Sequence, residues 1–194
     1  MRNYLRTSCC AVAIAALVLP AGIVMAAPVP GLIYTVILPA GEFGSLAYTG
    51  VVVSGLAAAR KFCAELKDKA YRVDCLAERF GVLARSIPKN SDYDEVKAAL
   101  KSASDRMGDL ARKNRDQNLP RGRATRPGSS ETTTRPLTPV AAPVADQVNQ
   151  QALTILAETE TLLLRSAEGS KSKIAQYAQI ADAIGSNKVL LRAA

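Results

Sequence analysis

The sequence predicts a mainly α-helical protein, an antiparallel helical hairpin or small helical bundle. Apolar residues make up 48% of the 194 residues, close to the globular average, so a hydrophobic core can form. Aromatic residues are only 5% and Trp is absent, so this core must consist of Ala, Leu, Val and Ile, which suits closely approaching helices. From about residue 56, apolar residues recur every three or four positions, the period of one helix face.

Residues 1–26 have the layout of a cleaved signal peptide. Two arginines open the segment, and an uncharged apolar run follows over residues 11–19. Small residues then precede a cleavage point between Ala26 and Ala27. We therefore expect export, with two of the four cysteines removed together with the signal.

Residues 27–55 form a second apolar segment, in which Glu42 is the only charge. Two β-rich runs, 32–38 and 47–53, surround a Pro/Gly turn, which predicts a short β-hairpin near the mature N-terminus. The alternative is an uncleaved membrane hairpin over residues 11–59, whose basic ends would both lie inside, in line with the positive-inside rule. Its second half is shorter than the roughly 20 residues that a membrane span needs, which favours the β-hairpin.

Residues 56–116 predict a pair of antiparallel helices. The first helix should end before Pro88, and Ser91 with Asp94 resembles a capping box that starts the second. A short join of this kind places two helices side by side, and Gly108 indicates a close contact between them. The first stripe is Phe62, Leu66, Ala70, Val73, Ala77, Phe80 and Ala84, and the second is Tyr93, Val96, Leu100, Ala103, Met107, Leu110 and Asn114.

Cys63 and Cys75 are the two cysteines that would remain after cleavage. Outside the cytoplasm an even pair usually forms a disulfide, whose Cα atoms lie within about 7 Å. On one unbroken helix the two would be roughly 18 Å apart. We therefore predict a turn at residues 67–69, with Asp68 capping the helix that follows. The alternative is an unbroken helix with two free or intermolecular thiols; a redox active site is disfavoured because the spacing is not C-x-x-C.

Residues 117–142 predict a flexible, disordered basic linker. They contain four of the ten prolines and no apolar periodicity. One interpretation is an anion-binding arm made by Arg121, Arg123 and Arg126. The other, which we favour, is that arginine keeps the linker soluble, because no aromatic residues alternate with the arginines as in a single-strand nucleic-acid platform.

Residues 143–194 predict two further helices, separated near Gly169 and closed by Gly185 as a C-cap. Each apolar stripe lasts only about three heptads, so packing within one bundle is favoured over a sustained coiled coil. Association of several chains through these helices stays open. The third stripe is Val144, Val148, Ala152, Ile155, Thr159, Leu162 and Ser166, widened by Leu156 and Leu163, and the fourth is Ile174, Tyr177, Ala181 and Ile184.

The sequence contains no motif that points to catalysis, a cofactor or a metal. Histidine is absent, which removes histidine acid–base chemistry and Ser–His or Cys–His nucleophiles. The S-x-x-K match from Ser170 to Lys173 is interpreted as a polar helix start. The cluster Asp92, Asp94 and Glu95 is interpreted as complementing a helix dipole.

These observations favour a periplasmic or secreted, non-enzymatic helical protein without a cofactor, which acts through a helix face on an envelope partner. That partner is a protein or an anionic envelope surface rather than nucleic acid, and a homo-oligomer is a further interpretation. The alternative is an inner-membrane protein anchored through residues 11–59.

Overall fold

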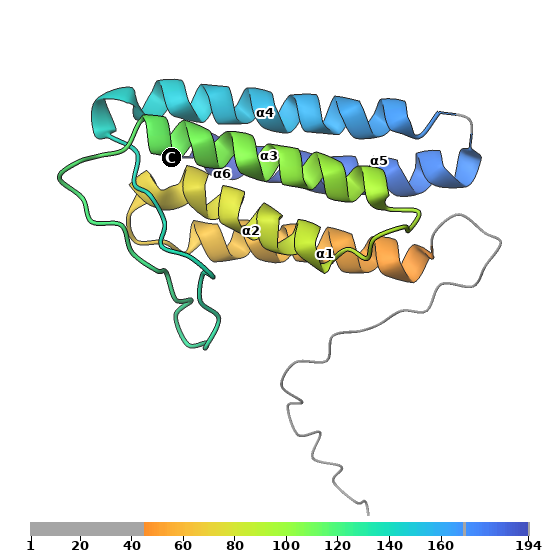
Figure 1. Ribbon diagram of the computed structural model, residues 1–194, viewed down its shortest axis with the longest axis horizontal. Coiled ribbons are helices and arrows are strands. Elements are labelled where there is room, and N and C mark those ends of the chain that lie inside the picture. Colours follow the sequence, from red (N-terminus) through yellow and green to blue (C-terminus); the bar gives the residue numbers. More distant parts are fainter. Residues whose placement is uncertain (1–44, 169, 194) are drawn as a thin grey trace, which may run out of the picture. The chain divides into compact units, whose positions relative to one another are not determined.

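The computed structural model describes residues 45–168 and 170–193, which are mainly helical, as predicted. Figure 1 shows the five longer helices running side by side, with α3 next to both α2 and α4. Residues 117–142, for which we expected a linker, join α3 to α4. The helices are α1 (Leu46–Ala64), α2 (Arg72–Ser86), α3 (Asp94–Lys113), α4 (Ala145–Ser166), α5 (Lys171–Ser186) and the short α6 (Lys188–Arg192).

The core lies where the predicted apolar stripes meet, and α2 and α3 make its most extensive contact. Gly81 allows these helices to approach closely. A Cβ at Gly81 would lie 2.7 Å from Ser104 Oγ, and one at Gly108 would lie 3.9 Å from the Cβ of Ala77. Gly108 thus faces α2, but a Cβ there would be in ordinary van der Waals contact with Ala77, so the close approach lies at Gly81 and not at Gly108 as expected.

The N-terminal segment differs from its prediction, because residues 47–53 belong to helix α1 and not to a β-strand. The helix begins ten residues before the expected start, where the Ser45 hydroxyl accepts a hydrogen bond from Tyr48 N at 3.0 Å. Val52 and Leu56 are buried in the bundle, so tertiary packing overrides the β-propensity of the valine run. Residues 32–38 and the cleavage point at Ala26 and Ala27 lie outside the described residues.

The same helix bears on the alternative of a membrane hairpin over residues 11–59. Of this range, residues 45–59 are described by the structure. Residues 46–59 lie in α1, which packs against α2 and α5. Among the helices of the described part, none has the length and apolar character of a membrane span.

The predicted turn between the two cysteines is confirmed. Helix α1 ends at Ala64, and a short 3₁₀ helix, η1 (Lys69–Tyr71), precedes α2. The Asp68 carboxylate accepts a hydrogen bond from Ala70 N at 2.8 Å, which caps η1 as expected. The chain can therefore reverse direction within a few residues.

Four details of the later helices differ from the sequence pattern. Ser91 caps a turn just before α3, through Tyr93 N, and not the helix itself. Gly185 lies inside the last turn of α5, where a Cβ would clash with the Glu160 carboxylate. Leu162 and Ile174, which we expected in the core, are 55% and 47% exposed. A strict 3.5-residue pattern drifts around a real helix of 3.6 residues per turn, so such stripes lose the buried face near their ends.

Candidate functional site

The segment 117–142 is held against the bundle and is not the flexible tether that its composition predicts. We call residues 114–141 the docked loop; Figure 1 shows it leaving α3 and returning to α4. Leu137 and Val140 are buried within it. The proline and arginine content of the segment predicted disorder. Individual polar contacts hold the loop in place, and such contacts leave no periodic pattern in the sequence. Its two arms meet through isolated antiparallel bridges, which pair Arg115 with Val140, Gly122 with Leu137 and Thr125 with Thr132.

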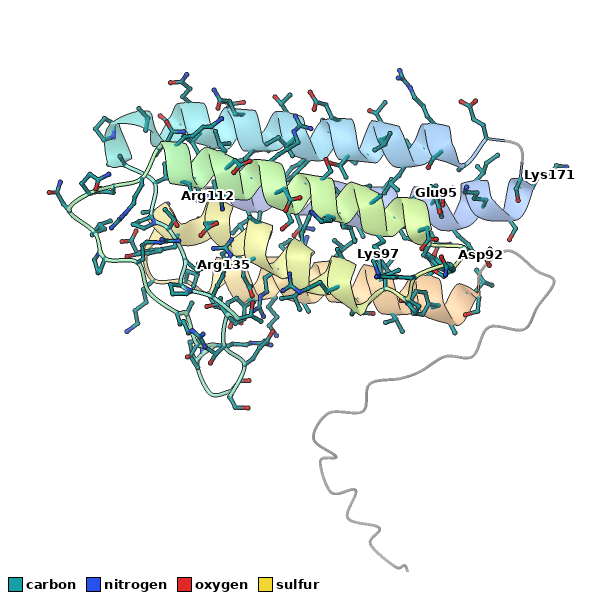
Figure 2. All side chains as sticks on the ribbon, viewed as in Figure 1. Asp92, Glu95, Lys97, Arg112, Arg135 and Lys171 are labelled. Atoms are coloured by element: carbon teal, nitrogen blue, oxygen red, sulfur yellow. A yellow bond between two sulfur atoms is a disulfide. The ribbon has the colours of Figure 1, made fainter. Side chains whose placement is uncertain are left out.

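Asp74 on α2 is the first anchor of the docked loop. Its carboxylate is fully buried and accepts hydrogen bonds from both terminal nitrogens of Arg135, at 2.6 and 2.7 Å. Thr138 N donates a third bond at 2.7 Å. Figure 2 labels Arg135 where the loop meets the helices. The hydrogen bonds to Asp74 raise the pKa of Arg135, and they provide the compensation that a buried carboxylate requires.

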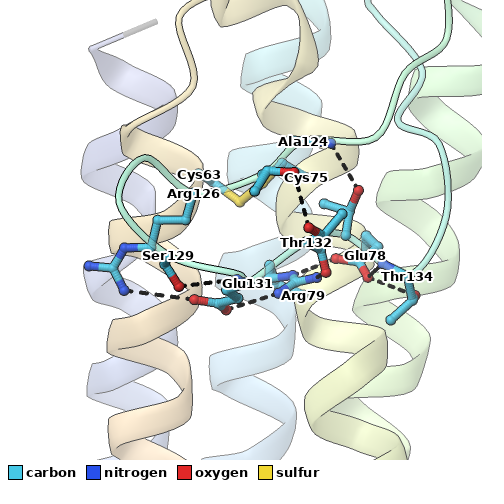
Figure 3. A network of polar contacts seen from close by, with 12 residues as sticks. Cys63, Cys75, Glu78, Arg79, Ala124, Arg126, Ser129, Glu131, Thr132 and Thr134 are labelled. Carbon is cyan, nitrogen blue, oxygen red and sulfur yellow. Dashed lines mark hydrogen bonds and ion pairs between the residues drawn. A yellow bond between two sulfur atoms is a disulfide. The ribbon is translucent and has the colours of Figure 1, made fainter.

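Glu78, one helical turn further along α2, is the second anchor (Figure 3). It accepts hydrogen bonds from Thr134 N and Oγ1, both at 2.8 Å, and pairs with Arg79. Arg79 also forms an ion pair with Glu131, with 3.1 Å between nitrogen and oxygen. Its guanidinium carbon lies 4.5 Å from the centroid of the Phe62 ring, which is a cation–π contact. Burial raises the pKa of Glu78, but the bonds from Arg79 and Thr134 outweigh it, so this pKa lies below its ordinary value.

Cys63 on α1 and Cys75 on α2 lie at disulfide distance, with Cα atoms 5.8 Å apart and both side chains buried. Cys75 follows Asp74 directly, so one stretch of α2 contacts α1 on one side and the docked loop on the other. Figure 3 shows the sulfur pair beside the loop's polar contacts. The sequence indicated the cysteine pair, but not the buried acids of α2, because a lone Asp or Glu within a helix usually faces solvent.

The three arginines of the alternative anion-binding arm lie in different surroundings. Arg126 pairs with Glu65 at 3.0 Å and lies 3.7 Å from a Glu131 oxygen. Arg121 and Arg123 are exposed. Arg126 is therefore engaged in ion pairs, and anion binding by the three arginines stays an untested alternative.

A second polar cluster lies near the start of α1. Thr49 Oγ1, the Tyr93 hydroxyl and the Gln176 side-chain oxygen lie within 2.9 Å of one another and are buried. The two hydroxyls donate to the Gln176 oxygen, which accepts, so the arrangement joins α1, the N-cap residue of α3 and α5.

Glu95 and Tyr177 extend this second cluster. Glu95 accepts hydrogen bonds from Tyr177 at 2.8 Å and from Lys173 at 2.7 Å; Figure 2 shows it close to Asp92. Burial raises the pKa of Glu95, but the bonds from Lys173 and Tyr177 lower it below its ordinary value. Ser170 accepts a bond from Lys173 N and caps α5, so the S-x-x-K match is a helix start, as expected. Among the described residues, no group of His, Cys, Asp or Glu side chains is suited to hold a metal ion.

The outward face of α1 is an uncharged surface with exposed apolar side chains. No charged residue occurs from Leu46 to Ala59, and Leu46 is 70% and Val51 47% exposed. A Cβ at Gly50 would meet no described atom within 4 Å, so packing inside the bundle does not require glycine there. The exposed residues on this face are Leu46, Ala47, Gly50, Val51, Ser54, Ala57 and Ala58.

No family model, curated protein or solved structure matches this chain. Its function therefore has to be argued from its own residues. Of the surfaces described above, the docked loop and the cluster of Thr49, Tyr93 and Gln176 direct polar groups into hydrogen bonds within the fold, although Arg115 Nε and Thr138 Oγ1 of the loop are buried without a partner among the described residues. The outward face of α1 leaves apolar groups exposed.

Proposed function

We propose that this chain is an exported, non-enzymatic binding protein that docks the outward face of α1 against a helix of an envelope protein. The observation that carries the proposal is the exposure of Leu46 and Val51 on a helix face without charge. Large apolar side chains on a continuous uncharged patch are typical of surfaces that bind a partner.

The spacing on this face favours a helix as the partner. Ala47, Gly50, Ser54 and Ala57 follow one another at intervals of three, four and three. That spacing forms a straight seam, and small side chains let a second backbone approach closely, as in interfaces built on small residues. Glycine inside a helix costs about 1 kcal/mol relative to Ala, and close approach of a partner explains its presence at Gly50.

Two observations support export. The N-terminal sequence has the signal layout that ends at Ala26, and Cys63 and Cys75 lie at disulfide distance. Disulfides persist mainly in oxidising compartments outside the cytoplasm. The intact mass of the native chain tests this directly: we expect a chain that starts at Ala27 and is two hydrogens lighter than its reduced form. A full-length chain in the membrane fraction would contradict export.

Docking is tested by placing a photo-crosslinking amino acid at Val51, with the same group at Lys101 on the exposed side of α3 as control. We expect a crosslink to one envelope protein from position 51 only. The variant Gly50→Leu should abolish it, because the larger side chain keeps the partner backbone away, while the helical circular dichroism is unchanged.

Other results would overturn the docking proposal. Crosslinks between two copies of the chain would indicate a homo-oligomer instead. Crosslinks to lipid would indicate an anionic envelope surface. A crosslink that persists in Gly50→Leu would place the contact elsewhere.

A further inference from the structure

An open groove of about 640 Å³ lies between the C-terminal half of α1 and α6. Its lining is apolar apart from three cations, and Val189 at its edge is 59% exposed. Most of its apolar side chains are alanines, which leave room between the helices and do not fill it. The apolar lining consists of Ala57, Ala58, Ala64, Val189, Leu190 and Ala193.

The polar part of the groove is positive. Arg60, Lys61 and Arg72 line it, and no described acidic residue does. The two arginines donate to backbone carbonyls, Arg60 to Ser186 at 3.5 Å and Arg72 to Ala193 at 3.2 Å. Neither arginine forms an ion pair with a carboxylate among the described residues.

Several cations elsewhere in the described chain do pair with acids. Arg79, Arg126 and Arg135 all pair with Glu or Asp. Lys173 and Lys188 do so as well. The groove thus combines an apolar floor with three cations, none of which forms an ion pair with a carboxylate of the described residues.

We propose that this groove binds a free, single-chain carboxylate amphiphile of the fatty-acid type. The carboxylate would lie between Arg60, Lys61 and Arg72, because guanidinium and ammonium groups form charge-assisted hydrogen bonds with carboxylates. The hydrocarbon chain would lie along the alanines towards Val189. This inference goes beyond the proposed docking of α1; the groove shares Ala57 and Ala58 with the docking face but does not include Gly50.

The shape of the groove favours a free amphiphile over a membrane surface. Insertion into a bilayer needs large apolar side chains that project outward, and alanine methyl groups do not reach into a headgroup region. Of the lining residues, only Val189 is an exposed large apolar side chain. A concave alanine floor beside cations is better suited to enclosing one chain.

The probe for this proposal is laurate, titrated at monomeric concentration into the whole chain with ¹³C-labelled alanine and valine methyl groups. We expect saturable shifts at Ala57, Ala58 and Val189. Dodecyltrimethylammonium, with the same chain and the opposite charge, should bind at least about tenfold more weakly, since it loses the charge-assisted bonds. Each methylene added between octanoate and laurate should strengthen binding by up to about fourfold.

The variant pair for this test is Arg60→Gln with Lys61→Gln, compared with Lys101→Gln on α3. The double variant should weaken laurate binding about tenfold or more, and the control should not change it. Val189→Ser should weaken binding through the chain end without adding charge beside the cations. Gly50→Leu should leave laurate binding intact, so failure of the α1 docking proposal and failure of this one are distinguishable.

Three results would overturn the inference. Laurate and dodecyltrimethylammonium could bind equally, which would show a non-specific apolar surface. Binding could appear only with phosphatidylglycerol vesicles, which would indicate a membrane surface. The methyl groups of the groove could also show no saturable shift.

Discussion

Arg135 and Asp74 are 61 residues apart in the sequence, yet both terminal nitrogens of the arginine bond to the buried carboxylate, at 2.6 and 2.7 Å. This pair fixes a Pro- and Arg-rich segment to the first turn of α2. The docked loop therefore belongs to the fold, and its removal should affect the stability of the bundle.

We predict that Arg135→Ala destabilises the protein by about 2–4 kcal/mol. Removing one partner of a buried pair leaves an uncompensated charge, which costs 3–5 kcal/mol when both groups are buried, and about a third of Arg135 is exposed. Urea unfolding monitored by circular dichroism measures the change. Arg123→Ala, an exposed arginine of the same loop, is the control and should change stability by less than about 0.5 kcal/mol. Equal effects of the two variants would show that the Asp74 pair does not anchor the loop.

The pairing of Cys63 with Cys75 predicts a redox-dependent stability. Closing a loop across a separation of 12 residues stabilises by about 3 kcal/mol in the chain-entropy model. We expect dithiothreitol to lower the free energy of unfolding by about this amount. The double variant Cys63→Ala with Cys75→Ala should have the same free energy of unfolding as the reduced protein, and dithiothreitol should not change it. Sensitivity to reductant in this double variant would contradict the assignment.

The pKa of Glu78 predicts how stability responds to acid. Bonds from Arg79 and Thr134 outweigh burial and hold this pKa below its ordinary value of 4.5, so the unfolded chain binds the proton more readily. The contribution of Glu78 is therefore present above pH 4.5 and is lost as pH falls through the lower folded-state pKa. Urea unfolding at several pH values below 5 should show a steeper loss for the natural protein than for Glu78→Gln. Parallel curves would mean that Glu78 is not the carboxylate responsible.

The helical bundle was predictable because its signal is periodic. Apolar residues recur with the period of a helix from Tyr93 to Met107. The members of this stripe that lie in α3, namely Val96, Leu100, Ala103 and Met107, are all buried. The turn at residues 67–69 followed from a distance argument alone, since two cysteines on one helix could not meet.

The anchoring of the docked loop was not predictable because nothing in it is periodic. Asp74 and Glu78 occur four residues apart on a helix, a spacing that ordinary surface acids share. Their burial depends on Arg135 and Thr134, more than fifty residues away. Long-range polar pairing of this kind leaves no local pattern. The start of α1 was predicted wrongly because the sequence there has a strong local β-pattern. Packing inside the bundle overrides that pattern.

Tyr177 predicts the response to alkali, with the opposite sign from Glu78. Burial, followed by the hydrogen bond to Glu95, raises its pKa well above the ordinary 10.0. The unfolded chain then releases the proton first, so the stabilisation is complete below pH 10 and declines as pH rises towards the folded-state pKa. Tyr177→Phe should lose about 1–2 kcal/mol at neutral pH, because the hydroxyl's bonds to Asp92 O and Glu95, both 2.8 Å, are gone.

Between pH 9 and 11, the free energy of unfolding should fall less for Tyr177→Phe than for the natural protein. The variant lacks the hydroxyl that ionises when the natural chain unfolds in alkali. Thermal unfolding over this range, with Tyr71→Phe as a comparison at a less buried tyrosine, separates the effect from the titration of lysines, which all three proteins share. An alkaline decline in Tyr177→Phe as steep as in the natural protein would assign the sensitivity to other groups. The neutral-pH loss would then measure only the hydrogen bonds that join α5 to α3.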